Sequence, residues 1–126
     1  MTRNILVIDD DELILGTLKR LLRGEGYGVS TAQSGQEAIE KIKNVNYNLI
    51  ITDIRMPGLD GVETIKQIRK SLSELGKDHI PELVITGYDS EDNRQKTGDL
   101  KVAGFLTKPF DLKELLSNIE AHIKNE

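Results

Sequence analysis

The sequence predicts a single α/β domain built on a doubly wound parallel sheet of five strands, with helices on both faces. Short apolar runs alternate along the chain with segments whose apolar residues recur at helical spacing. The runs are continuously apolar, as is typical of strands that are buried on both faces of a parallel sheet. A length of 126 residues suits one domain with one core.

Five apolar runs are the expected strands, and the segments between them are the expected helices. The strands are Ile5–Ile8, Val29–Thr31, Leu49–Thr52, Leu83–Thr86 and Phe105–Thr107. The helices are Leu13–Leu22 with Gly24 as its stop, Gln36–Lys43 capped by Ser34, Val62–Leu75 ending near Gly76, and Leu112–Ile123 capped by Asp111. Alternation of strands and helices of this length implies right-handed crossovers.

The segment Asp89–Asp99 is the exception to this pattern. Alternation places a fourth helix here, but the segment has no aliphatic or aromatic residue to bury. Ser90 is a candidate cap for such a helix, and Leu100 and Val102 are candidate anchors at its end. A shortened helix and local disorder are both compatible with this composition.

The composition argues against several functional classes. The formal net charge is −4 and no dense Lys/Arg run is present, which argues against nucleic acid as the main partner. The longest apolar stretches have four or five residues, too few to cross a membrane, and the first residues show no signal peptide. The absence of cysteine excludes disulfides, thiolate metal sites and a cysteine nucleophile. We therefore expect a soluble cytoplasmic domain.

Charged residues follow or close three of the expected strands. Asp9 and Asp10 follow the first strand, Asp53 closes the third, and Lys108 follows the fifth. Ligands of doubly wound folds bind beyond the carboxyl ends of the strands, so these groups are expected in one pocket. Neighbouring carboxylates raise one another's pKa unless a cation intervenes, and oxygen ligands without His or Cys match Mg²⁺. The pattern indicates metal-assisted phosphoryl chemistry on a carboxylate.

Several of these residues also have a structural interpretation. Asp11 and Glu12 directly precede a helix, and for them capping and compensation of the helix dipole are favoured by about four to one. Lys108 could lie over the sheet edge as a surface charge, although Pro109 restricts the backbone there. Thr86, at the end of the fourth strand, offers a hydroxyl to a phosphoryl oxygen, but threonine is also simply a good strand residue.

Short motifs at the strand ends, all in order, resemble the receiver domain of two-component response regulators over essentially the whole chain. The motifs are Asp9-Asp10, Asp53 within Thr52–Gly61, Thr86-Gly87 and Lys108-Pro109-Phe110. The resemblance implies a flavodoxin-like strand order of 2-1-3-4-5 and a receiver domain over residues 1–126, with no output domain among them. It also implies a phosphorylation-dependent signalling switch that catalyses only its own phosphotransfer and autodephosphorylation.

The resemblance gives each charged residue a role. Asp53 would accept a phosphoryl group from a phosphohistidine. Asp10, Asp53 and the backbone carbonyl of Arg55 would ligate Mg²⁺, while Asp9 would hold metal-bound water. Lys108 would pair first with Asp53 and then with the phosphoryl group.

Further expectations concern the switch and the bond before the proline. Thr86 would move toward the phosphoryl group, and Phe105 would turn inward with it. Phe105 stands where many family members have tyrosine. Receivers carry a cis peptide before this proline, so a cis bond is predicted between Lys108 and Pro109.

Arg55 and Tyr88 occupy two variable positions that flank the phosphorylation site in receivers. Both are bulky, and we expect them to shield the acyl phosphate from water and slow autodephosphorylation. The implied partners are a sensor histidine kinase or histidine phosphotransfer protein and an output partner or output domain, without nucleic acid or membrane. In the family the fourth helix and fifth strand contribute to the output surface, and the polar Asp89–Asp99 segment argues against homodimerisation through that surface. A partner-specific or flexible surface is an equal alternative, and a weak or phosphorylation-dependent homodimer stays compatible with the resemblance.

Three other functions compete with the receiver interpretation. A haloacid-dehalogenase-type phosphatase needs a second Asp two residues after its nucleophile, where this chain has Arg55, and the chain has no room for a cap domain. A flavodoxin-like nucleotide binder needs a Gly/Ser/Thr-rich phosphate loop after the first strand, where this chain has four acidic residues. A pseudo-receiver is disfavoured because no site residue is missing.

Overall fold

The computed structural model describes residues 2–54, 60–87 and 98–125 and contains the predicted parallel sheet. Its strands are β1 (Asn4–Ile8), β2 (Gly28–Ala32), β3 (Leu49–Asp53), β4 (Glu82–Thr86) and β5 (Gly104–Thr107). They are ordered β2-β1-β3-β4-β5, and every neighbouring pair is parallel. The predicted fold class and strand order are confirmed.

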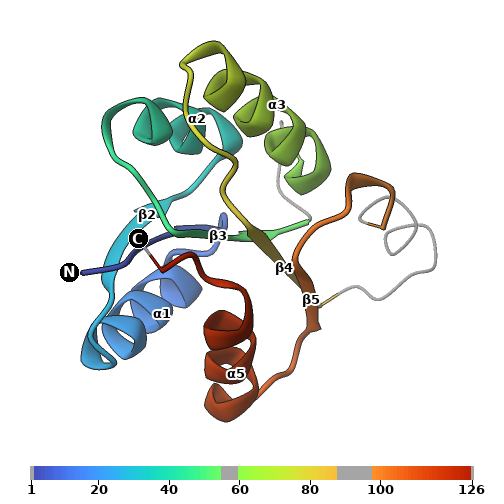
Figure 1. Ribbon diagram of the computed structural model, residues 1–126. Coiled ribbons are helices and arrows are strands. Elements are labelled where there is room, and N and C mark those ends of the chain that lie inside the picture. The colour runs from blue at the N-terminus through green and yellow to red at the C-terminus, as the bar shows by residue number, and fades with distance from the viewer. Residues whose placement is uncertain (1, 55–59, 88–97, 126) are drawn as a thin grey trace.

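Helices cover both faces of the sheet. They are α1 (Glu12–Gly24), α2 (Gly35–Asn44), α3 (Gly61–Glu74) and α5 (Leu112–His122). Helices α1 and α5 lie on one face, and α2 and α3 lie on the other (Figure 1). No helix in the described part of the chain is both long and apolar enough to cross a membrane.

Strand β1 shows why the apolar runs are continuous. Ile5 and Val7 belong to the core cluster that also contains buried residues of α1 and α5. Leu6 and Ile8 belong to the cluster that contains buried residues of α2 and α3. All four side chains are at most 1% exposed, so successive residues are buried on opposite faces of the central sheet.

Each helix begins at a side chain that accepts hydrogen bonds from its first turn. Asp11 caps α1 and accepts from the amide of Leu13 at 2.9 Å, which confirms its capping interpretation. Ser34 and Asp111 cap α2 and α5, as predicted. Asp60 caps α3, which therefore begins one residue earlier than expected.

The predicted fourth helix falls largely outside the described residues, because Asp89–Asp99 overlaps the gap at 88–97. Residues 98–100 form a helical turn, in which the amide of Lys101 donates to the carbonyl of Gly98 at 3.0 Å. Leu100 and Val102 pack, as expected of anchors, against a small buried cluster that we call the α3–β4 cluster. It consists of Ile54, Ile65 and Val84.

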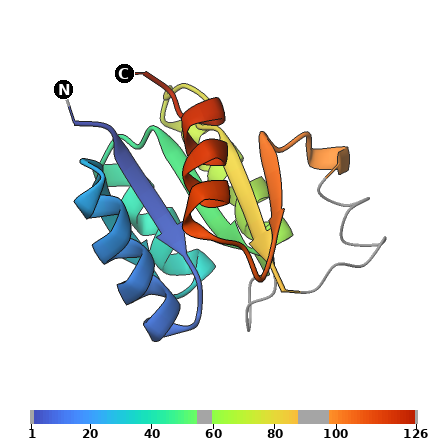
Figure 2. The ribbon, with the colours of Figure 1, turned by 90° about the horizontal axis from the view of Figure 1, so that it is seen from below.

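The strand register brings the charged strand ends to one edge of the sheet. Ile8 pairs with Thr52, so the residues that follow them, Asp9 and Asp53, are neighbours. On the next strands, Thr86 pairs with Thr107, the residue before Lys108. Figure 2 shows all strands running in one direction. Both chain termini lie at the end of the sheet opposite the carboxyl ends of the strands.

Candidate functional site

Three of the predicted site residues meet at the carboxyl edge of the sheet. The ammonium of Lys108 donates to Oδ2 of Asp53 at 3.0 Å and to Oδ2 of Asp9 at 3.4 Å. The exposed fractions of these side chains are 25% for Lys108, 12% for Asp53 and 6% for Asp9. A single half-buried cation therefore lies between two nearly buried carboxylates. We call these three residues the Lys108 site.

Asp9 is held firmly by the backbone around it. Its amide donates to the carbonyl of Ala32, and its Oδ1 accepts from the amide of Asp11, both at 3.0 Å. Burial raises the pKa of Asp9; the Asp11 amide and the Lys108 charge act against this, while the Asp53 charge adds to it. The net direction of the pKa is upward, so the folded site disfavours the ionised form of Asp9 relative to water even with Lys108 beside it.

The backbone around Asp53 is also fixed on both sides. The hydroxyl of Thr52, a fully buried side chain, donates to the carbonyl oxygen of Asp53 at 2.9 Å. The carbonyl of the next residue, Ile54, accepts from the amide of Gly61 at 3.0 Å. Ile54 itself is buried in the α3–β4 cluster. The carboxylate of Asp53 thus projects from a rigid strand end.

Lys108 is positioned by the turn between β5 and α5. Its peptide bond to Pro109 is cis, in agreement with the prediction, and Phe110 packs against the core cluster beneath α1 and α5. Burial lowers the pKa of Lys108, but the hydrogen bond to Asp53 and the charges of both carboxylates outweigh it and raise that pKa. The residue is therefore charged at neutral pH, and its two carboxylate contacts replace the interpretation of a surface charge over the sheet edge.

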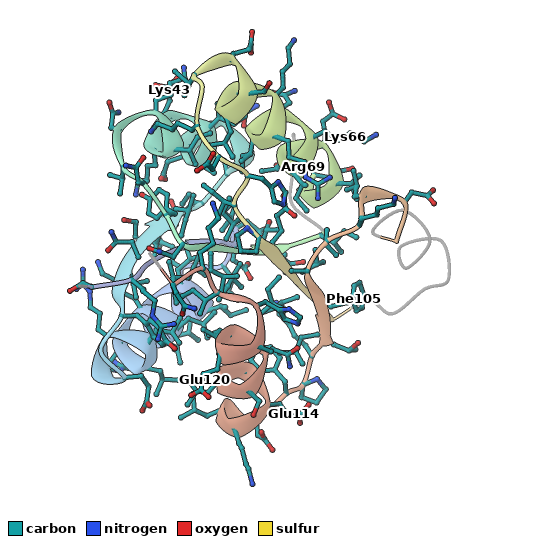
Figure 3. All side chains as sticks on the ribbon, viewed as in Figure 1. Lys43, Lys66, Arg69, Phe105, Glu114 and Glu120 are labelled. Carbon is teal, nitrogen blue, oxygen red and sulfur yellow. The ribbon has the colours of Figure 1, made fainter. Side chains whose placement is uncertain are left out.

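The other predicted site residues lie beside this group or outside the described residues. Asp10 is exposed directly after Asp9. Thr86 is the last residue of β4. Phe105 lies on the edge strand β5 (Figure 3). It is half-buried and packs against the α3–β4 cluster. Arg55 and Tyr88 lie outside the described residues, so the predictions for them stay predictions.

The donor set fits a hard divalent cation that keeps part of its water shell. Among the described residues, two carboxylates share the Lys108 ammonium, so these three groups together carry one excess negative charge, to which Asp10 adds. Within residues 2–54, 60–87 and 98–125, no three acidic or histidine side chains are grouped closely enough to enclose an ion. Mg²⁺ does not require such a cage, because it is commonly bound by one or two carboxylates together with water and phosphate oxygens.

The sequence reasoning missed a second buried ion pair, at the other end of β4. Arg69 of α3 donates through Nε and Nη2 to the two carboxylate oxygens of Glu82, both at 2.8 Å. Its Nη1 donates to the carbonyl of Leu100 at 2.6 Å (Figure 3 labels Arg69). The Glu82 side chain is 1% exposed. An acidic residue between Pro81 and the apolar run at Leu83 was the signal that could have indicated it.

Comparison with known proteins identifies relatives for nearly the whole chain. A family model described as the response regulator receiver domain matches residues 5–120. The response regulator MprA of Mycobacterium sp. (strain KMS) is 38% identical over 124 residues, which are 98% of this chain and 52% of that protein. The alkaline phosphatase synthesis transcriptional regulatory protein PhoP of Bacillus subtilis (strain 168) is 35% identical, over 98% of this chain and 50% of PhoP. The chain thus spans about half the length of the curated relatives it matches.

Solved structures of receiver proteins share this fold over nearly the whole chain. The chemotaxis protein CheY4 of Vibrio cholerae superposes with a TM-score of 0.88 at 29% identity, covering 97% of this chain and 99% of CheY4. A CheY-like receiver domain protein of Methanospirillum hungatei JF-1 gives a TM-score of 0.86 at 30% identity, covering 96% and 93%. These matches favour the receiver interpretation over the hydrolase and nucleotide-binding alternatives.

Proposed function

This chain belongs to the response regulator receiver family, and from that premise we propose that Asp53 is its phosphoacceptor. The observation that carries the proposal is the contact between Asp53 and Lys108 at 3.0 Å, in a pocket where Asp9 supplies a second carboxylate. A cation at this distance can neutralise charge on a phosphoryl group as it is transferred. Positioning and electrostatic stabilisation are the main contributions to phosphoryl transfer in proteins.

The proposed phosphoryl transfer is a single displacement at phosphorus, assisted by positive charge. A carboxylate oxygen of Asp53 attacks the phosphorus of a phosphohistidine, the P–N bond breaks, and the histidine nitrogen leaves with the bonding electron pair. Bound Mg²⁺ would neutralise charge on the phosphoryl oxygens, and Asp10, Asp53 and the Arg55 carbonyl are proposed to hold it, with Asp9 orienting its water. Lys108 exchanges its contact with the Asp53 carboxylate for one with a phosphoryl oxygen.

The consequences of phosphorylation are proposed to begin at Thr86 and Phe105. Thr86 ends the strand next to β3, and Phe105 follows it on the edge strand, half-buried against the α3–β4 cluster. Movement of Thr86 toward the phosphoryl group would leave space into which Phe105 turns. The surface around β5 would then differ between the two states.

The lifetime of the phosphate is proposed to depend on Arg55 and Tyr88. Large side chains beside an acyl phosphate exclude attacking water, so autodephosphorylation should be slow. Arg55→Ala and Tyr88→Ala are expected to lose phosphate faster when decay of the phosphorylated protein is followed by phosphate-affinity electrophoresis. An unchanged lifetime in both variants would contradict shielding.

The proposed partners follow from the same chemistry. The phosphoryl donor is a sensor histidine kinase or a histidine phosphotransfer protein in the cytoplasm. The phosphorylated form is read by an output partner or by an output domain outside the sequence given.

The acceptor assignment is tested by labelling with a small acyl phosphate in Mg²⁺. Wild-type protein should gain one acid-labile phosphoryl group, and Asp53→Asn should gain none. Asp111→Asn is the matched control, since Asp111 is an exposed helix cap and its loss leaves the site intact. Persistent labelling of Asp53→Asn would reject Asp53 as the acceptor.

A further inference from the structure

The first residue of α3, Gly61, lies directly against the backbone of Asp53. A Cβ atom built on Gly61 would be 2.3 Å from the carbonyl oxygen of Asp53 and 2.5 Å from the Cα of Ile54. Both are backbone atoms, so no rotation of a side chain can relieve such a contact. We propose that Gly61 is a positioning residue for the acceptor carboxylate, an inference that rests on the proposed role of Asp53.

The conformation of Gly61 does not itself call for glycine. Gly61 lies outside the left-handed region that favours glycine, unlike Gly26 at φ 95° and Gly76 at φ 70°. Glycine is also a poor helix former, so its presence in the first turn weakens α3. The close approach of the helix to Asp53 is the feature that requires the missing side chain.

Hydrogen bonds hold the two backbones together at this point. The Gly61 amide donates to the Ile54 carbonyl at 3.0 Å, and the cap residue Asp60 accepts from the amide of Glu63 at 2.8 Å. On the strand side, the Thr52 hydroxyl donates to the same Asp53 oxygen that faces Gly61. The start of α3 and the end of β3 are thus one rigid unit.

A side chain at position 61 would have to displace one of the two backbones. Helix α3 resists displacement because one of its faces is buried against the sheet and Arg69 pairs with Glu82 of β4. The buried side chains of the helix are Thr64, Ile65, Ile68 and Leu72. Asp53 is the last residue of its strand, and its carboxylate depends on a 3.0 Å contact with Lys108. A shift of Asp53 therefore moves the nucleophile relative to the cation that assists it.

The test compares Gly61→Ala with two matched variants. Gly16→Ala makes the same change in α1, where the added carbon meets no atom within 4 Å beyond its chain neighbours and the backbone of its own helix. Asp60→Ala removes the cap of the same helix without adding a group against Asp53. The measurements are the rate of phosphorylation by acetyl phosphate in saturating Mg²⁺, on protein shown to be folded by circular dichroism, and the urea unfolding curve.

Gly61→Ala is expected to lower the phosphorylation rate about tenfold or more, because small misplacements of reacting groups have large effects on rate. Gly16→Ala should stay within about twofold of wild type, and Asp60→Ala should lower stability without lowering the rate of the folded protein. A folded Gly61→Ala protein that reacts at the wild-type rate would overturn the proposal. So would an Asp60→Ala rate as low as that of Gly61→Ala, because the effect would then follow helix stability.

Two further experiments cover the cases in which Gly61→Ala does not fold or the wild-type protein is not phosphorylated. If Gly61→Ala does not fold, the double variant Gly16→Ala/Gly61→Ala supplies the measurement, since alanine stabilises an open helical position. A crystal structure of the variant reports the position of Asp53 directly. An Asp53 carboxylate displaced from Lys108 supports positioning even if wild-type protein is not phosphorylated, in which case only the proposed function fails. An undisplaced carboxylate contradicts it.

Discussion

Asp53 and Glu82 are both acidic residues of the parallel sheet with a basic partner, but they lie at opposite ends of their strands. At the carboxyl end of β3, Asp53 shares the Lys108 ammonium with Asp9, at 3.0 and 3.4 Å. At the amino end of β4, Glu82 has the Arg69 guanidinium for both of its oxygens, each at 2.8 Å. The Glu82 side chain is 1% exposed and that of Asp53 is 12% exposed.

The difference between the two groups is one of charge balance. The Arg69–Glu82 pair is neutral and bidentate, its carboxylate is buried, and Nη1 of the guanidinium donates to the Leu100 carbonyl. The Lys108 site has more carboxylates than cations, and lysine is a point charge that can change partners. A balanced pair holds three segments of the fold together, whereas the unbalanced group leaves negative charge that suits a divalent cation, as the proposed function requires. Residue types alone would not separate these roles.

Removing the ammonium of the Lys108 site should have the largest effect. Lys108→Met is expected to lower the rate of phosphorylation by acetyl phosphate by about 10²- to 10³-fold, the usual cost of losing one electrostatic stabiliser of a transition state. Mg²⁺ binding should become tighter, because a competing positive charge is lost beside two carboxylates. Isothermal titration calorimetry and labelling kinetics measure the two effects. An unchanged rate would place Lys108 outside the chemistry.

Opening the Arg69–Glu82 pair should change stability without changing chemistry. Glu82→Gln leaves the guanidinium without its counter-charge and is expected to cost about 3 kcal/mol of unfolding free energy. Urea unfolding measures this, and Glu74→Gln at an exposed position of α3, the helix that carries Arg69, serves as the control. The phosphorylation rate of the folded Glu82→Gln protein should match wild type. A slowed rate would show that the pair also positions the site.

Replacing the whole pair with apolar side chains should recover most of that loss. Buried ion pairs can often be exchanged for packed hydrophobic residues at little cost, so Arg69→Met/Glu82→Leu should be more stable than Glu82→Gln. A deficit of about 1 kcal/mol is expected to remain, because the Leu100 carbonyl loses its donor. Unfolding of the double variant and of both single variants gives the coupling energy. A double variant no more stable than Glu82→Gln would mean that the pair has no apolar substitute.

Neutralising Asp9 should stabilise the metal-free protein while impairing the site. Its folded-state pKa lies above the ordinary value of 3.8, so the folded protein binds this proton more readily than the unfolded chain does. The contribution of Asp9 to stability therefore falls as pH rises through the window between 3.8 and the raised pKa. Asp9→Asn removes this cost and keeps an acceptor for the Asp11 amide. We expect a gain of up to about 1 kcal/mol at neutral pH, within the usual range for single substitutions.

The pH dependence of that gain provides its control. In urea unfolding without Mg²⁺, the advantage of Asp9→Asn should vanish below the ordinary pKa, where the wild-type carboxyl is protonated in both states. Mg²⁺ affinity should be lower than in wild type at neutral pH. A variant that is less stable than wild type at neutral pH would show that the attraction of Lys108 outweighs burial.

The two groups also differ in how far sequence could predict them. The continuous run Ile5–Ile8 indicated a strand buried on both faces, and the acidic residue after it indicated the carboxyl edge, because parallel strands place their ends together. The Lys108 site follows from such local signals in chain order. Glu82 carries no local signal of comparable strength, because the guanidinium that makes its burial tolerable comes from another element. The contact of Gly61 with Asp53 depends in the same way on how α3 is packed.

Opening a third ion pair, which is exposed, should change stability least and shows how much burial contributes to the other two. Lys43 and Glu40 of α2 lie 3.1 Å apart, nearly the separation of Lys108 and Asp53, but their side chains are 45% and 71% exposed. Water and salt screen such a pair, so Glu40→Gln should change the unfolding free energy by less than about 0.5 kcal/mol. Lys43 also keeps its favourable position in the last turn of the helix. A loss in urea unfolding as large as that of Glu82→Gln would mean that distance, rather than burial and charge balance, decides what an ion pair contributes in this fold.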